Sequence, residues 1–176
     1  ETFHALKKIL LEKGYATSVG DEGGFAPNLS SNEEACEVII EAIETAGFVP
    51  GQDISLSMDA AASSFYKNGT YEFFKSGQGT KTSTQILEFY NNMVEKYPIV
   101  SIEDPMDEHD WDGFVAITKK LGAKIQIVGD DLFVTNTEFV KKGVNKNAAN
   151  AVLIKLNQIG TVSETVATIQ LCQKAG

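Results

Sequence analysis

Acidic side chains stand at the ends of several apolar segments of this sequence. The segments ISLSMD, IVSIED and IQIVGDD end in Asp59, in Glu103 with Asp104, and in Asp130 with Asp131. An ionised carboxylate is costly to remove from water unless a cation or hydrogen-bond donors meet it. The repetition of acids at the ends of apolar segments therefore favours a ligand site over a set of unrelated turns.

Three of these acids, Asp59, Glu103 and Asp130, form the donor set of a predicted metal site. Carboxylates that converge repel one another, so they draw in protons and cations. Oxygen ligands that leave positions for water and substrate suit a hard divalent cation, Mg²⁺ above all. Asp104 and Asp131 are also compatible with a helix N-cap or a turn.

Two further residues could move protons at the same place. Lys155 lies in the apolar segment AVLIKLN, where burial and a nearby cation would both lower the pKa of its amine and make it a base. The run YATSVGDEGG carries Asp21 and Glu22 into a glycine-rich turn, where Glu22 could be kept protonated as a general acid. A base, an acid and a metal together describe proton abstraction next to a carboxylate, followed by elimination.

The elements that must position these residues alternate along the chain. Amphipathic helices are predicted at 1–14, 32–47, 83–97, 110–122, 136–144 and 161–176, apolar strands at 52–61, 99–104, 125–131 and 150–157, and a hairpin over 63–74 around Asn68-Gly69. Nearly continuous apolar strands between helices are typical of a parallel sheet, whose carboxyl ends bind ligands. A doubly wound sheet and an eight-stranded barrel both fit. The sequence contains no GxGxxG motif, which would favour the first.

Composition excludes several classes of protein. The chain has 176 residues, enough for one domain with a core, and a formal net charge of −9. An acidic chain lacks the basic face that nucleic acids require. No apolar stretch reaches the roughly 20 residues of a membrane span. The two cysteines show no metal-type or paired spacing.

Four segments in order, GDEGGFAPN, SIEDP, VGDDLFVTN and KLNQIGTVSET, resemble the signature segments of the enolase family. SMDAAASSFYKNGTYEF resembles the segment that holds that family's first metal-binding aspartate. The resemblance implies an α/β fold, a partial TIM-type (β/α) barrel with parallel strands, helices and the hairpin near Asn68-Gly69. Residues 1–176 would then be a single, incomplete C-terminal barrel domain, without the N-terminal domain and the last barrel strands.

The resemblance also assigns roles to individual residues. It implies that Asp59, Glu103 and Asp130 bind Mg²⁺, that Lys155 removes the C2 proton of 2-phosphoglycerate, and that Glu22 assists departure of the C3 hydroxyl. All of these except Asp59 would also contact the substrate. The expected activity is the reversible dehydration of 2-phosphoglycerate to phosphoenolpyruvate, by a full-length enzyme of which this piece alone is inactive. The enzyme would be a cytoplasmic homodimer or larger oligomer, with an additional cell-surface or secreted pool as an option.

Two alternatives stay open from the sequence. One is another enolase-superfamily enzyme, a racemase or an acid-sugar dehydratase, which usually carries a Lys-x-Lys motif on an earlier strand that is absent from the strands predicted here. The other is a non-catalytic role in binding a partner at a cell surface, for which the sequence offers no specific feature.

Overall fold

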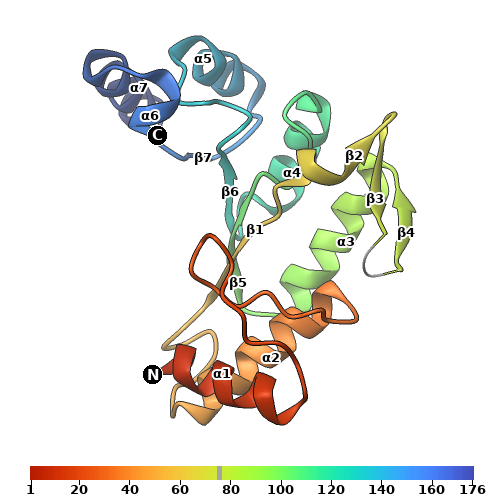
Figure 1. Cartoon of the computed structure of the whole chain (residues 1–176). Helices are drawn as coiled ribbons and strands as arrows, with labels where there is room; N and C mark the ends of the chain where they lie inside the picture. Colours follow the sequence, from red (N-terminus) through yellow and green to blue (C-terminus); the bar gives the residue numbers. More distant parts are fainter. Residues whose placement is uncertain (75–76) are drawn as a thin grey trace.

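The computed structural model describes residues 1–74 and 77–176, which form two β-sheets and the helices around them (Figure 1). The parallel sheet contains β1 (Leu56–Asp59), β5 (Ile99–Glu103), β6 (Gln126–Gly129) and β7 (Ala151–Val152). The antiparallel sheet contains β2 (Tyr66–Lys67), β3 (Thr70–Phe73) and β4 (Gly79–Lys81). The helices are α1 (Thr2–Glu12), α2 (Asn32–Thr45), the 3₁₀ turn η1 (Ala62–Phe65), α3 (Ser83–Lys96), α4 (Trp111–Leu121), α5 (Thr137–Lys146), α6 (Leu156–Ile159) and α7 (Val162–Ala175).

The parallel sheet confirms the alternation of strands and helices that the sequence predicts. Its strands lie in the order β1-β5-β6-β7 and every neighbouring pair is parallel. Asp59 pairs with Glu103 in register, and Glu103 pairs with Val128, so the carboxyl ends of β1, β5 and β6 lie at one edge of the sheet. We call this end of the sheet the carboxyl edge.

One expected contribution to that edge is wrong. The run at 15–24 does not join the parallel sheet; a single antiparallel bridge between Val19 and Phe25 closes it into a local loop. The backbone of the loop bonds to itself, with the amides of Gly20 and Gly23 donating to the carbonyls of Gly24 and Gly20. The glycines favour this tight turn, and Gly23 has the left-handed φ of 83° that glycine adopts readily.

The antiparallel sheet contains the predicted hairpin and one strand more. Asn68 and Gly69 both have positive φ, 50° and 84°, which is the backbone of the two-residue turn that matches strand twist. β4 then pairs with β3 and adds an outer strand that the sequence pattern did not single out. Thr82, directly after β4, caps α3 through a reciprocal pair of bonds with Gln85, which fixes the point where the helix begins.

Apolar side chains between the parallel sheet and α3 and α4 form the main core. Ile102 and Ile127 of the sheet and Phe114, Ile117 and Leu121 of α4 are all fully buried. The three α4 residues are spaced along one helical face, as the sequence predicts. This packing holds β5 and β6 rigidly, which matters because both carry acids to the carboxyl edge.

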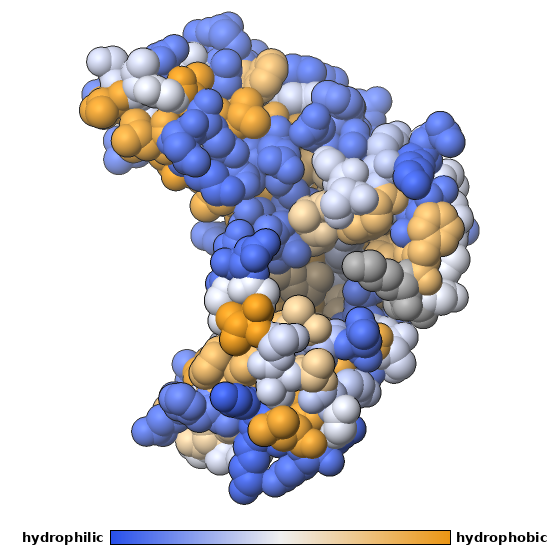
Figure 2. Space-filling model, viewed as in Figure 1, coloured by the Kyte–Doolittle hydropathy of each residue, from blue (hydrophilic) through white to orange (hydrophobic). Residues whose placement is uncertain are grey.

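The molecule as a whole is a crescent (Figure 2). Helices α1 and α2 lie at one end of it and α5, α6 and α7 at the other, with the parallel sheet between them (Figure 1). β1 and β7 are the outer strands of the sheet, and within the described ranges each pairs on one side only. Nowhere in those ranges does a helix have the length and apolar character that crossing a lipid bilayer demands.

Candidate metal and proton-transfer site

Glu103 stands at the centre of the carboxyl edge. It is the last residue of β5, the strand between β1 and β6. Burial raises the pKa of its carboxyl group above the usual value, and the charges of Asp59 and Asp130 raise it further. No hydrogen bond or ion pair to the Glu103 side chain occurs in 1–74 and 77–176. The fold therefore places the three predicted ligands at the same edge of the sheet and, among the described residues, gives the central one no hydrogen-bond donor.

Asp59 is an exposed carboxylate with one oxygen already engaged. Its Oδ1 accepts a hydrogen bond of 2.9 Å from the backbone amide of Ala61, two residues later. Ala61 has a left-handed φ of 42°, and the bond fixes the orientation of the Asp59 side chain against the turn into η1. The second oxygen, Oδ2, receives no bond from the described residues and is open to a ligand.

Asp130 follows β6 directly, and only 9% of its side chain is exposed. Its Oδ2 accepts a bond of 2.5 Å from Lys155 Nζ, and its Oδ1 accepts one of 2.7 Å from Gln158 Nε2. Both oxygens are thus held by groups that follow β7. These bonds aim the carboxylate and bring the predicted base beside a predicted metal ligand.

Lys155 is not the buried lysine that the sequence predicts. β7 ends at Val152, so Lys155 lies beyond the strand, at the N-cap of α6, and 43% of its side chain is exposed. The hydrogen bond to Asp130 raises the pKa of its amine; burial opposes this rise, and the charges of Asp130 and Glu103 add to it. The expected burial and the expected lowering of its pKa are therefore wrong for the protein without a cation, because a carboxylate faces the amine.

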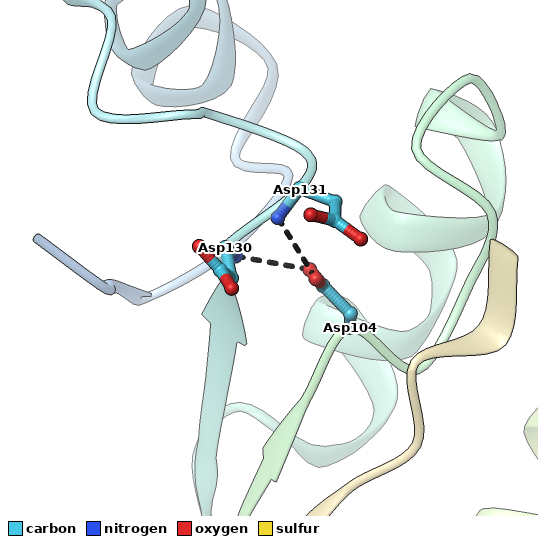
Figure 3. A group of neighbouring side chains, drawn as sticks. All are labelled: Asp104, Asp130 and Asp131. Carbon is cyan, nitrogen blue, oxygen red and sulfur yellow. Dashed lines mark hydrogen bonds between the residues drawn. The ribbon is translucent and has the colours of Figure 1, made fainter. Parts of the chain in front are cut away.

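Asp104 has a structural role that the sequence did not reveal. Its two carboxylate oxygens accept bonds of 3.0 Å and 2.8 Å from the backbone amides of Asp130 and Asp131 (Figure 3). Its side chain is buried, and burial raises the pKa of its carboxyl group to about 6. Asp104 also has φ of 40°, a left-handed value that excludes a helix N-cap, whose backbone is extended.

Asp104, Asp130 and Asp131 also form a compact carboxylate cluster. Each offers an oxygen, and these oxygens lie within 4.8 Å of one another, close enough for a metal ion. The cluster shares Asp130 with the predicted donor set. Both oxygens of Asp104 accept backbone amide hydrogens, so Asp104 anchors the end of β6 to the end of β5. The carboxylate of Asp130 is bonded instead by mobile side chains, those of Lys155 and Gln158, and we retain Asp130 with Asp59 and Glu103 as the proposed ligands.

Glu22 is the predicted site residue whose loop does not join the parallel sheet. It lies in the exposed turn between Gly20 and Gly24, and within the described part of the chain no bond or ion pair joins it to another side chain. The expected water-poor surroundings of its carboxyl group are therefore wrong here. The same exposure leaves the carboxyl group accessible to a ligand.

Two residues at the edge escaped prediction from the sequence. Gln158 contacts Asp130, and the buried Thr135 contacts both Gln158 and the backbone of Lys155. Gln158 follows Lys155 by three residues, a spacing that places both on one side of a helical turn, and this spacing was the available signal. Thr135 precedes the cap of α5 and gives no comparable signal.

Parallel strands between helices define the chain as an α/β protein, a class whose ligand sites lie at the carboxyl ends of the strands. All 176 residues match the family described as enolase, C-terminal TIM barrel domain. The chain therefore belongs to this family, and the barrel is the correct choice between the two folds that the sequence allowed.

A comparison with curated proteins gives a consistent result. The chain is 62% identical, over all 176 of its residues, to the protein named Enolase 1 from Methylococcus capsulatus. The matched region is 42% of that relative, so the chain spans less than half of the relative's length.

Proposed function

We propose that this chain is the part of an enolase that carries its metal ligands and its proton-abstracting lysine. The complete protein would catalyse the reversible dehydration of 2-phosphoglycerate to phosphoenolpyruvate. The observation that carries the proposal is the convergence of three carboxylates and Lys155 at one edge of a parallel sheet, in a chain of the enolase barrel family. Family membership supports this reaction, and the carboxyl edge offers residues with the chemistry that the reaction requires.

The donor set fits Mg²⁺. Among the described residues, Asp59 keeps one oxygen without a protein partner, and Glu103 keeps both. Three carboxylates at one edge carry more negative charge than the single amine of Lys155 offsets, which favours a hard divalent cation. When bound, Mg²⁺ would stabilise the enolate formed from the substrate.

Lys155 and Glu22 would carry out the two proton transfers of the reaction, Lys155 as the base and Glu22 as the acid. Lys155 Nζ, in its neutral form, would accept the C2 proton of the substrate. Its contact with Asp130 holds it beside the proposed ligands, so that the proton acceptor and the charge-stabilising groups share one place. Glu22 would protonate the departing C3 hydroxyl; its support is the family resemblance together with the open position of its turn. The substrate would contact Glu22, Glu103, Asp130 and Lys155.

The same resemblance supports the wider setting of the protein. We propose a cytoplasmic homo-oligomer, a dimer or larger, that acts on a small phosphorylated acid. The acidic net charge of −9 is consistent with a protein that does not bind nucleic acid. A relative that is longer than this chain supports a complete protein with further domains.

Exchange of the substrate's C2 proton with solvent deuterium tests the proposal in the complete protein. Wild type should convert 2-phosphoglycerate with Mg²⁺ present. Lys155→Ala should abolish both exchange and turnover, because the enolate no longer forms. Glu22→Gln should lower turnover on the order of 100-fold or more while exchange remains detectable, because the enolate still forms but cannot expel hydroxide.

Both variants must fold and bind Mg²⁺ for this comparison to hold, which circular dichroism and Mg²⁺ titration would establish. Loss of exchange in Glu22→Gln together with retained exchange in Lys155→Ala would reverse the two roles. A folded wild type that binds Mg²⁺ but leaves 2-phosphoglycerate unchanged would refute the proposed activity.

A further inference from the structure

Thr135 is a fully buried residue that contacts two of the groups around Asp130. Its hydroxyl accepts a bond of 2.9 Å from the backbone amide of Lys155 and lies 3.1 Å from Gln158 Oε1. Gln158 Nε2 in turn donates to Asp130 at 2.7 Å. One hydroxyl group therefore touches both the chain that carries the proposed base and the side chain that holds a proposed metal ligand.

The hydrogens in this network can be assigned in only one consistent way. Asp130 as a carboxylate can only accept, so the NH₂ group of Gln158 faces Asp130 and its Oε1 faces Thr135. The Thr135 hydroxyl, which accepts the hydrogen of the Lys155 amide, therefore donates its own hydrogen to Gln158 Oε1. Thr135 thereby holds the Oε1 end of the same amide whose NH₂ group donates to Asp130.

The backbone at Thr135 is held in an unfavourable conformation. Val134 and Thr135 have φ values of 42° and 57°, in the left-handed region that β-branched residues rarely adopt. The carbonyl of Thr135 accepts a bond of 2.7 Å from the hydroxyl of Thr168 in α7, so the turn is fixed from two sides. A conformation of this kind persists only when surrounding contacts impose it.

We propose that Thr135 is a positioning residue, which acts through Gln158 on the carboxylate of Asp130 and directly on the backbone of Lys155. Through Gln158 it sets the orientation of a metal ligand; through the Lys155 amide it sets the position of the proposed base at the start of α6. The inference rests on the proposed function for the identity of the cation, Mg²⁺. Groups that orient metal ligands are typically worth a factor of 10 to 100 in metal affinity.

Thr135→Val tests the proposal because valine keeps the shape and removes the hydroxyl. In the complete protein without substrate, the Mg²⁺ dissociation constant measured by calorimetry should rise on the order of 10-fold. C2 proton exchange at saturating Mg²⁺ should also fall, since the Lys155 amide has lost its acceptor. Thr135→Ser, which restores the hydroxyl, should recover both quantities.

Gln158→Met separates the two contacts of the Thr135 hydroxyl, one with the Gln158 side chain and one with the Lys155 amide. It removes the bond to Asp130 and leaves the contact between Thr135 and the Lys155 backbone in place. Its Mg²⁺ dissociation constant should therefore rise as in Thr135→Val, while exchange at saturating Mg²⁺ should fall less than in Thr135→Val. The double variant should bind Mg²⁺ no more weakly than Thr135→Val alone, because both changes act on the same bond to Asp130.

Thr165→Val is the matched control. Thr165 is another buried threonine, but its hydroxyl donates to the carbonyl of Thr161 within the first turn of α7 and contacts nothing at the carboxyl edge. This variant should leave both quantities unchanged. If Thr165→Val weakens Mg²⁺ binding as much as Thr135→Val does, the effect is general loosening and the proposal is wrong.

The Mg²⁺ affinity can be measured whether or not the proposed reaction is correct. Unchanged Mg²⁺ affinity in both Thr135→Val and Gln158→Met would overturn the inference whether or not the protein turns over its substrate. Should Thr135→Val fail to fold, the Mg²⁺ affinity of Gln158→Met still tests whether the bond from Gln158 to Asp130 supports metal binding. Loss of turnover in wild type with the Mg²⁺ effects intact would refute the proposed reaction and leave the positioning role standing.

Discussion

Glu103 and Asp110 are two carboxylates at the ends of neighbouring elements, and their surroundings are opposite. Asp110 accepts hydrogen bonds from the hydroxyls of Tyr71 and Ser83, at 2.8 Å and 2.6 Å, and from the amide of Gly113 at 2.9 Å. Glu103 accepts none within the part of the chain described, and its closest charged neighbours include Asp59 and Asp130.

The difference separates acids that serve the fold from acids kept for a ligand. Asp110 caps α4, and its bonds to Tyr71 and Ser83 join the antiparallel sheet and the start of α3 to that cap. Its charge is fully met by the protein's own donors. The charge of Glu103 is met by nothing comparable, so a cation that binds there would remove a repulsion that the fold leaves in place.

The largest effect that this comparison predicts is on Mg²⁺ binding in Glu103→Gln. A neutral amide replaces the central charged ligand, so half-saturating Mg²⁺ in an activity titration should rise on the order of 100-fold or more, since loss of a direct ligand should cost at least as much as loss of an outer-shell partner. Without Mg²⁺ the melting temperature should not fall, because the change removes a carboxylate repelled by its neighbours. An unchanged half-saturation point would exclude Glu103 as a ligand.

Asp110→Ala should show the reverse pattern. The change removes a helix cap and leaves the buried Tyr71 hydroxyl without its acceptor, so we expect a loss of about 2 kcal/mol in unfolding free energy. Urea denaturation of the complete protein would measure it. Mg²⁺ affinity of the folded variant should equal that of wild type; a selective loss of Mg²⁺ affinity with full stability would break the distinction between the two acids.

The smallest predicted effect is on stability at acid pH, and it concerns Glu34, a carboxylate near the surface that accepts hydrogen bonds from neighbouring residues. Glu34 accepts bonds from the hydroxyl of Tyr15 and from the amide and hydroxyl of Ser30, and these donors lower the pKa of its carboxyl group to about 2. Because the pKa is lower in the folded protein than in the unfolded chain, the ionised Glu34 stabilises the fold. This contribution is fully present at pH values above 4.5, the pKa in the unfolded chain, and is lost as the pH falls toward 2.

The test compares melting temperatures of wild type and Glu34→Gln between neutral pH and the onset of acid unfolding. The stability advantage of wild type should be constant above the usual carboxyl pKa and shrink as the pH falls below it. An advantage that grows toward low pH would mean that the Tyr15 and Ser30 bonds do not hold the ionised form.

The sequence predicted the sheet and its acids because both depend on local patterns. Asp59, Glu103 and Asp130 end apolar runs, and parallel pairing then brings strand ends together whatever the details of the loops. The hairpin at Asn68-Gly69 was predictable for the same reason, since the turn conformation is a property of those two residues.

What the sequence did not predict depends on where strands stop and on contacts between distant residues. The sequence predicts a strand over the whole apolar run at 150–157, but only Ala151 and Val152 pair with β6. Lys155 is therefore exposed and paired with Asp130, 25 residues earlier. The roles of Asp104 and Thr135 also arise from contacts across loops, which no periodicity records.

The register of the two sheets has a consequence for the order in which the chain folds. The strands of the hairpin are joined by two residues, so their pairing closes a very short loop and belongs to the microsecond events of folding. β1 pairs with β5 only after the hairpin sheet and α3, which lie between them in the sequence, have been enclosed as a loop. We therefore expect the carboxyl edge to be assembled after the hairpin, so that a cation which binds there would stabilise a sheet that has already formed.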